Sequence, residues 1–106
     1  MKLLTKEIAD KLQKQFPKGA DFDQMIIAKL FDPAGSWSWY LMNQDPEDHD
    51  YLWGIVDGFA VEMGSISLSE LESSKGALGI GIERDIYFKP IPASEVWEKL
   101  NKGVHV

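Results

Sequence analysis

The stretch MIIAKLFDPAGSWSWYLM, residues 25–42, decides the fold class. Residues 25–31 place apolar side chains at alternate positions, which predicts a β-strand, and Lys29 marks its other face as partly exposed. Asp32-Pro33-Ala34-Gly35 predicts a turn, because proline fixes the φ angle that the second turn position requires. Residues 36–42 then predict a return strand, paired antiparallel with the first.

The return strand carries a candidate aromatic surface. Trp37 and Trp39 lie two positions apart, so their side chains share one face of an extended strand. That face is either core beneath the helices or an exposed patch for a protein partner or for self-association. Tyr40 on the opposite face and Trp53 in the next predicted strand complete the set of candidate aromatic contacts. The choice depends on which face the helices cover.

The flanking sequence predicts the remaining elements of a single domain, residues 1–106. Further extended segments are predicted over residues 51–56, 59–66 and 82–88, and helices over residues 5–16, 68–74 and 92–101. Ser67 and Glu70 have the capping-box spacing that opens the short middle helix. The sequence therefore predicts an α+β fold with a four- to five-stranded, mainly antiparallel sheet. We expect the N- and C-terminal helices to pack on one face of this sheet.

Composition excludes several classes of protein. The 106 residues contain no cysteine, which excludes disulfides and thiolate-metal sites. The N-terminal residues lack the apolar core of a secretory signal, and no apolar run approaches the length of a membrane span. We therefore expect a cytoplasmic protein that does not bind membranes.

Charge is distributed unevenly along the chain. The net charge is −6, but residues 19–88 carry 13 acidic side chains against three basic ones, a net charge of −10. A segment this acidic repels phosphate backbones, so direct nucleic-acid binding is not expected. The same charge favours a partner protein with a basic surface.

The loop NQDPEDHD, residues 43–50, contains the densest group of acids. Asp45, Glu47, Asp48 and Asp50 are candidate partner-binding residues, and the alternative is an ordinary solvated loop. The spacing does not match a calcium-binding loop, and the loop lacks the glycine that such a site needs for its turn. No metal site is predicted here.

The segment 76–85 is a second candidate site. It is rich in glycine, but it lacks the order of a phosphate-binding loop, and Glu83 and Asp85 would repel a phosphate. Glu83, Arg84 and Asp85 would either contact a small ligand or form a structural ion network, as such arginine pairs commonly do. No catalytic motif is present, so we predict a non-enzymatic protein without a cofactor.

Several ordered motifs resemble a known family. LLTKEI at residues 3–8, WSWY at 37–40, SLSELES at 67–73 and IERD at 82–85 are similar to a family of small bacterial proteins of unknown function. Members of that family are commonly encoded on plasmids, integrative elements and phages. The resemblance runs from residue 2 to about residue 96, and it implies no activity and no catalytic residues.

The genetic setting implied by the resemblance suggests a function. Small acidic proteins of mobile elements include inhibitors of host defence nucleases, of anti-restriction and anti-CRISPR type, some of which mimic DNA with carboxylates. By this analogy, we expect a binding protein that acts on a host protein with a basic surface, in the narrower form a nuclease. The alternative is a small-ligand binding module or enzyme that uses the 76–85 loop.

Overall fold

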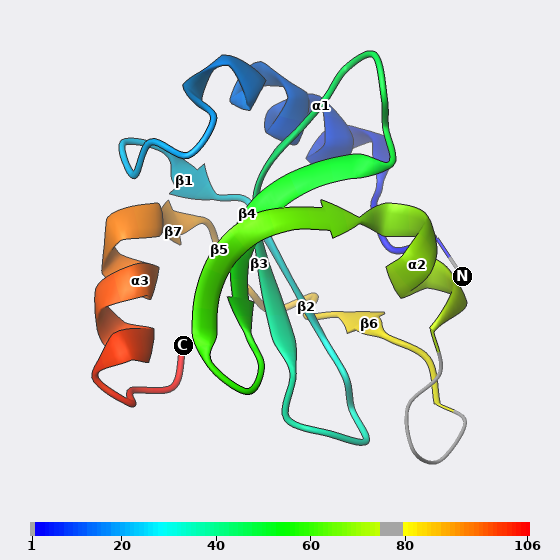
Figure 1. Cartoon of the computed structure of the whole chain (residues 1–106). Coiled ribbons are helices and arrows are strands. Elements are labelled where there is room, and N and C mark those ends of the chain that lie inside the picture. The colour runs from blue at the N-terminus through cyan, green and yellow to red at the C-terminus, as the bar shows by residue number, and fades with distance from the viewer. Residues whose placement is uncertain (1, 75–79) are drawn as a thin grey trace.

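The computed structural model describes residues 2–74 and 80–106 (Figure 1). Part of the predicted glycine-rich loop, residues 76–79, lies outside the described residues. The elements in chain order are α1 (Lys6–Lys14), the short 3-10 helix η1 (Phe16–Lys18), β1 (Met25–Ile26), β2 (Ala28–Phe31), β3 (Ser38–Gln44), β4 (Tyr51–Asp57), β5 (Val61–Ser67), α2 (Leu68–Ser73), β6 (Glu83–Arg84), β7 (Ile91–Pro92) and α3 (Ala93–Asn101). The α+β class is confirmed.

The main sheet has five antiparallel strands in the order β5-β4-β3-β2-β6. The turn at residues 32–35 forms as predicted: the Gly35 N–H donates to the carbonyl oxygen of Asp32 at 3.2 Å, and Phe31 pairs with Ser38. The single strand predicted over residues 25–31 is interrupted at Ile27, and β1 pairs with β7 in a separate two-stranded sheet. This second sheet holds the start of α3 beside the main sheet.

The two terminal helices lie against opposite faces of the sheet, so the expectation of one shared face is wrong. Along β3, alternate side chains belong to two different cores. The core beneath α1 contains Ile8, Leu12, Leu30, Trp39, Leu41 and Leu52, and the core beneath α3 contains Tyr40, Met42, Ile55, Val96 and Leu100. Apolar residues occupy both sets of alternate positions, so each face needs its own cover. Figure 1 shows α1 at the top of the view and α3 at the left.

Local capping fixes the helix ends. The Thr5 hydroxyl accepts a hydrogen bond from the Ile8 N–H at 3.1 Å and so begins α1. Ser67 does the same for Glu70 at the start of α2, as the capping-box spacing predicts. Gly103, with φ of 75°, ends α3 in the left-handed conformation that glycine adopts readily. None of the helices in the described part of the chain has the length and apolarity of a membrane span.

The glycine at position 54 allows a close backbone approach between β3 and β4. A side chain at Gly54 would meet the carbonyl oxygen of Tyr40 and, at 3.2 Å, the Cα atom of Leu41. These are backbone atoms in the centre of the sheet, so they cannot move aside. Gly64 is paired directly with Gly54 across β4 and β5, but nothing lies within 4 Å of the corresponding position.

We therefore expect Gly54→Ala to lower the free energy of unfolding by at least about 2 kcal/mol, since overpacking forces the backbone apart. Gly64→Ala, on the directly opposite residue, should change it by less than about 1 kcal/mol. Urea denaturation of both variants measures the difference. Equal effects of the two substitutions would contradict the close approach at Gly54.

Candidate functional site

The acidic loop, residues 45–50, connects β3 to β4 and has a defined backbone conformation. The Asp45 N–H donates to the carbonyl oxygen of Tyr51 at 3.0 Å, and the Tyr51 N–H donates to that of Asp48 at 3.0 Å. The Asp48 N–H donates in turn to the carbonyl oxygen of Asp45 at 3.3 Å. These three bonds close the loop on itself, so its side chains project from a fixed frame.

The first three acids of the loop lack cationic partners in the described part of the chain. Asp45 Oδ1 accepts from the Glu47 N–H at 2.8 Å, and Asp48 Oδ1 accepts from the Asp50 N–H at 3.2 Å. The ion pairs found within residues 2–74 and 80–106 lie elsewhere, on or beside the helices α1, η1 and α3. The charges of Asp45, Glu47 and Asp48 are therefore available to an external cation.

Asp50 has a structural role as well as a charge. Its carboxylate accepts hydrogen bonds from the Ser69 N–H at 2.6 Å and the Ser67 hydroxyl at 2.9 Å, at the beginning of α2. The hydrogen bonds from Ser69 have the largest effect on the pKa of the Asp50 carboxyl, and that from Ser67 adds to it. Together they lower this pKa below its ordinary value of 3.8. Asp50 thus joins the acidic loop to α2.

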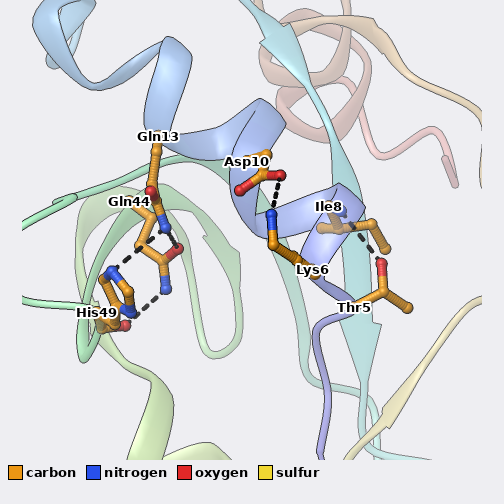
Figure 2. A network of polar contacts seen from close by, with 7 residues as sticks. All are labelled: Thr5, Lys6, Ile8, Asp10, Gln13, Gln44 and His49. Atoms are coloured by element: carbon orange, nitrogen blue, oxygen red, sulfur yellow. Dashed lines mark hydrogen bonds and ion pairs between the residues drawn. The ribbon is translucent and has the colours of Figure 1, made fainter.

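A chain of amide contacts joins the other side of the loop to α1 (Figure 2). The Gln13 side-chain amide of α1 donates to Gln44 Oε1 at 2.9 Å, and the Gln44 amide donates to the carbonyl oxygen of His49 at 2.7 Å. The His49 ring nitrogen Nε2 lies 3.1 Å from the carbonyl oxygen of Pro46. Because Gln44 is only 2% exposed, this connection is sheltered from water. The loop is therefore attached to two helices.

A cavity of about 400 Å³ opens beneath the loop, and we call it the aromatic pocket. Its lining combines aromatic rings, two acids and small residues: Phe16, Gly19, Ala20, Asn43, Asp45, Asp48, Tyr51 and Trp53. The rings of Phe16 and Tyr51 are nearly perpendicular, with centroids 6.5 Å apart. Two of the predicted acids and one predicted aromatic residue thus meet at a single cavity.

Asn43 forms a buried wall of this pocket. Its side chain is 1% exposed, and its amide nitrogen donates to the carbonyl oxygen of Gly19 at 2.9 Å and to Gln24 Oε1 at 3.0 Å. These bonds hold the turn that follows η1 against β3. Asn43 Oδ1 and Trp53 Nε1 have no hydrogen-bond partner within the described residues. Buried polar atoms without partners are rare and mark a place where a bound group could pair with them.

The other predicted aromatic residues lie away from this pocket. Trp37 and Trp39 share a face as expected, with ring centroids 6.1 Å apart, and both are half-buried. Trp39 packs against the core beneath α1, whereas Trp37 meets the fully exposed Phe59 ring edge-on at 5.2 Å. Tyr40 is 1% exposed and is buried beneath α3. Of the four, Trp53 therefore lines the aromatic pocket, and it also packs against the same core as Tyr40.

Glu83, Arg84 and Asp85 do not form one cluster of paired charges. Arg84 donates from Nη1 to the carbonyl oxygen of Leu3 at 2.6 Å, which ties the N-terminal segment to β6. Asp85 Oδ1 accepts from the Tyr87 N–H at 2.9 Å, and Glu83 is exposed. No group of three metal-ligating side chains occurs within residues 2–74 and 80–106.

Lys29 departs most from the sequence-based expectation, because it is 6% exposed and not at a solvated face. Its ammonium group donates to the main-chain oxygen of Val106 at 2.7 Å and lies 5.5 Å from the centre of the Tyr40 ring. The Tyr40 hydroxyl donates to the same oxygen at 3.2 Å, and burial followed by the charge of Asp57 raises its pKa to about 12. A second cavity of about 490 Å³ lies here, bordered by Lys29 and Asp85.

A comparison with known families matches residues 3–104 to the family described as "Protein of unknown function (DUF2958)". The chain belongs to this family. Neither a comparison with curated proteins nor one with solved structures finds a significant match. Family membership therefore names no activity, and the site has to be interpreted from its own geometry.

Sequence reasoning missed two parts of the site in this DUF2958 protein. Phe16 was expected as the last residue of the first helix, but α1 ends at Lys14, and Phe16 begins η1 and lines the aromatic pocket. Asn43 was expected in the loop, but β3 continues through it to Gln44 after an irregularity between Leu41 and Asn43. The one sequence signal for an aromatic pocket beside the loop was Tyr51, an aromatic residue directly after the acids.

The hydrogen bonds at Asp50 predict a pH dependence of stability. A carboxyl whose pKa is lower in the folded state stabilises that state above its unfolded pKa, near 3.8, and this contribution is lost as the pH falls through the folded pKa. Asp50→Asn should therefore lower the free energy of unfolding at pH 7, and the difference from the wild type should shrink below about pH 4. Urea denaturation at both pH values measures this, with Glu47→Gln as a control on the same loop. A difference that stays constant with pH would contradict the role of the charged Asp50.

Proposed function

We propose that this protein is a non-enzymatic binding protein that uses its acidic loop and aromatic pocket to bind a basic surface of another protein. The observation that carries the proposal is the position of Asp45 and Asp48, whose carboxylates border an aromatic cavity without a cationic partner in the described chain. Tyrosine, tryptophan and complementary charge are the features that anchor protein interfaces.

The charge of the whole middle segment, the loop included, supports the same proposal. The net charge of −10 over residues 19–88 would attract a basic surface from a distance and speed its association. The same field disfavours direct contact with nucleic acid. The loop acids then act at short range, where the fixed backbone of residues 45–51 holds them in place.

In the narrower form of the proposal, the protein is encoded on a mobile genetic element and inhibits a host defence nuclease of restriction or CRISPR type. Carboxylates of the acidic loop would occupy basic residues that otherwise bind the phosphates of DNA or RNA. This form is supported by the acidic charge and by the mobile-element setting that the motif resemblance implies. It names a class of partner that can be assayed directly.

A second candidate function is small-ligand binding beside the 76–85 segment. It is supported by the cavity of about 490 Å³ bordered by the buried Lys29 and by Asp85, where charges of both signs are present. Arg84 is already engaged with Leu3, so Asp85 rather than Arg84 would face the ligand. Stabilisation by a metabolite or nucleotide in a thermal-shift screen would favour this function.

The partner-binding proposal predicts that a nuclease from a panel of restriction and CRISPR enzymes is inhibited, and that the acidic loop is required. Replacing Asp45, Glu47 and Asp48 by their amides should weaken binding to that nuclease by about tenfold or more, because three charges that face the basic surface are lost. Asp50 is kept, since its removal would also disturb α2. Binding of the wild type should weaken as salt is raised.

The matched control removes the same charge elsewhere. Glu62, Glu70 and Glu83 are exposed, lie on β5, α2 and β6, and form no ion pair within the described residues. Their replacement by glutamine should change binding by less than about twofold. Equal weakening by both triple variants would remove the loop from the proposal. Failure of the intact protein to bind any nuclease of the panel would overturn its narrower form.

A further inference from the structure

We propose that the aromatic pocket is a binding site for an arginine side chain of the partner protein. This inference rests on the proposed function, because it specifies what the partner presents at the acidic loop. The pocket lies between the end of η1, the buried Asn43 of β3 and the first residues of β4. Its volume of about 400 Å³ lies within the usual range of sites that enclose a small ligand group.

The aromatic walls suit a planar cation. Phe16 and Tyr51 present rings at nearly a right angle, and Trp53 adds a larger ring from the same strand as Tyr51. A guanidinium group stacks on aromatic faces and is attracted by their negative charge density. Tyr51 is 39% exposed, so one wall of the pocket can be reached from solvent.

Acceptor atoms predominate among the unpartnered polar atoms of the residues that line the pocket, and the exception is the indole N–H donor of Trp53. Asp45 and Asp48 each use Oδ1 within the loop, and no hydrogen bond to either Oδ2 is found in the described part of the chain. Asn43 Oδ1, in a side chain that is 1% exposed, has no partner among these residues either. Because an unpaired buried acceptor is costly, a donor that reaches it would be stabilised.

Arginine fits this set of groups better than the other side chains. No lysine, arginine or histidine is among the residues that line the pocket, and two of those residues are acids, so an anion would be repelled. The guanidinium carries five N–H donors in a rigid plane, which allows it to pair with several acceptors while it stacks on a ring. Lysine offers only a compact charge without a face to stack.

The four tryptophans allow a direct test with small probes. In two-dimensional proton–nitrogen NMR spectra, each indole N–H gives its own resonance, and Trp53 is the only tryptophan that lines the pocket. N-acetyl-arginine-N-methylamide should shift the Trp53 indole resonance saturably and leave those of Trp37 and Trp39 unchanged. The matching citrulline compound, which has nearly the same shape without the charge, should bind at least about fivefold more weakly. The lysine compound should also bind more weakly than the arginine compound.

Variants of the intact protein separate specific binding from general attraction. Asp45→Asn and Asp48→Asn keep the shape of the loop and should each weaken arginine binding by about threefold to tenfold. Glu62→Gln, which removes an exposed acid of β5 outside both the acidic loop and the pocket lining, is the matched control and should have an effect below about twofold. Ala20→Leu should block the pocket without any change in charge. The remaining resonances of each variant report whether it is folded.

Four results of the probe experiments would overturn the arginine pocket. They are no shift of the Trp53 indole resonance at about 50 mM probe, equal binding of the citrulline compound, equal binding of the lysine compound, and an effect of Glu62→Gln as large as those of the two aspartate substitutions. The test is independent of the proposed function. If the probe binds as expected but no nuclease is inhibited, the pocket stands and the nuclease proposal fails. If a nuclease is bound through the loop but Ala20→Leu is harmless to that complex, the proposed function stands and the pocket fails.

Discussion

The structure depends on burying the central strand β3 on both of its faces. Five consecutive residues of this strand, from Tyr40 to Gln44, are buried, which requires a separate layer above and below the sheet. Alpha-helix α1 provides one layer and α3 provides the other. The end of the same strand leads directly into the acidic loop, so the two layers that stabilise the sheet also determine where the loop carboxylates lie.

Most of the strand order was available from the sequence, because it depends on local signals. The turn at Asp32-Pro33-Ala34-Gly35 and the short connection at Asp57-Gly58 place β2 to β5 side by side without long crossings. The placement of the helices was not available from these signals. Tyr40, Leu41 and Met42 are apolar at successive positions, which is the pattern of a strand covered on both faces. The alternation of serine and tryptophan just before them obscured that pattern.

The candidate site was predictable only where its residues are adjacent in the chain. The acids of residues 45–50 form a visible cluster, whereas Phe16 and Tyr51 meet only because η1 packs beside the start of β4. The irregularity after Leu41 also changes which side chains of β3 share a face, and no sequence pattern announces it. Lys29 shows the same limit, since its ammonium group donates to the main-chain oxygen of Val106, 77 residues further along the chain.

If the acidic loop binds a partner protein as proposed, its attachment to both α1 and α2 has a consequence for selectivity. A loop fixed by Gln44 on one side and by Asp50 on the other is already ordered before any partner arrives. Little conformational entropy is then lost on association, but the loop also cannot reshape itself to suit a different surface. A rigid template of this kind discriminates by the spacing of the charges that it meets. Related surfaces of equal charge but different geometry would therefore be rejected.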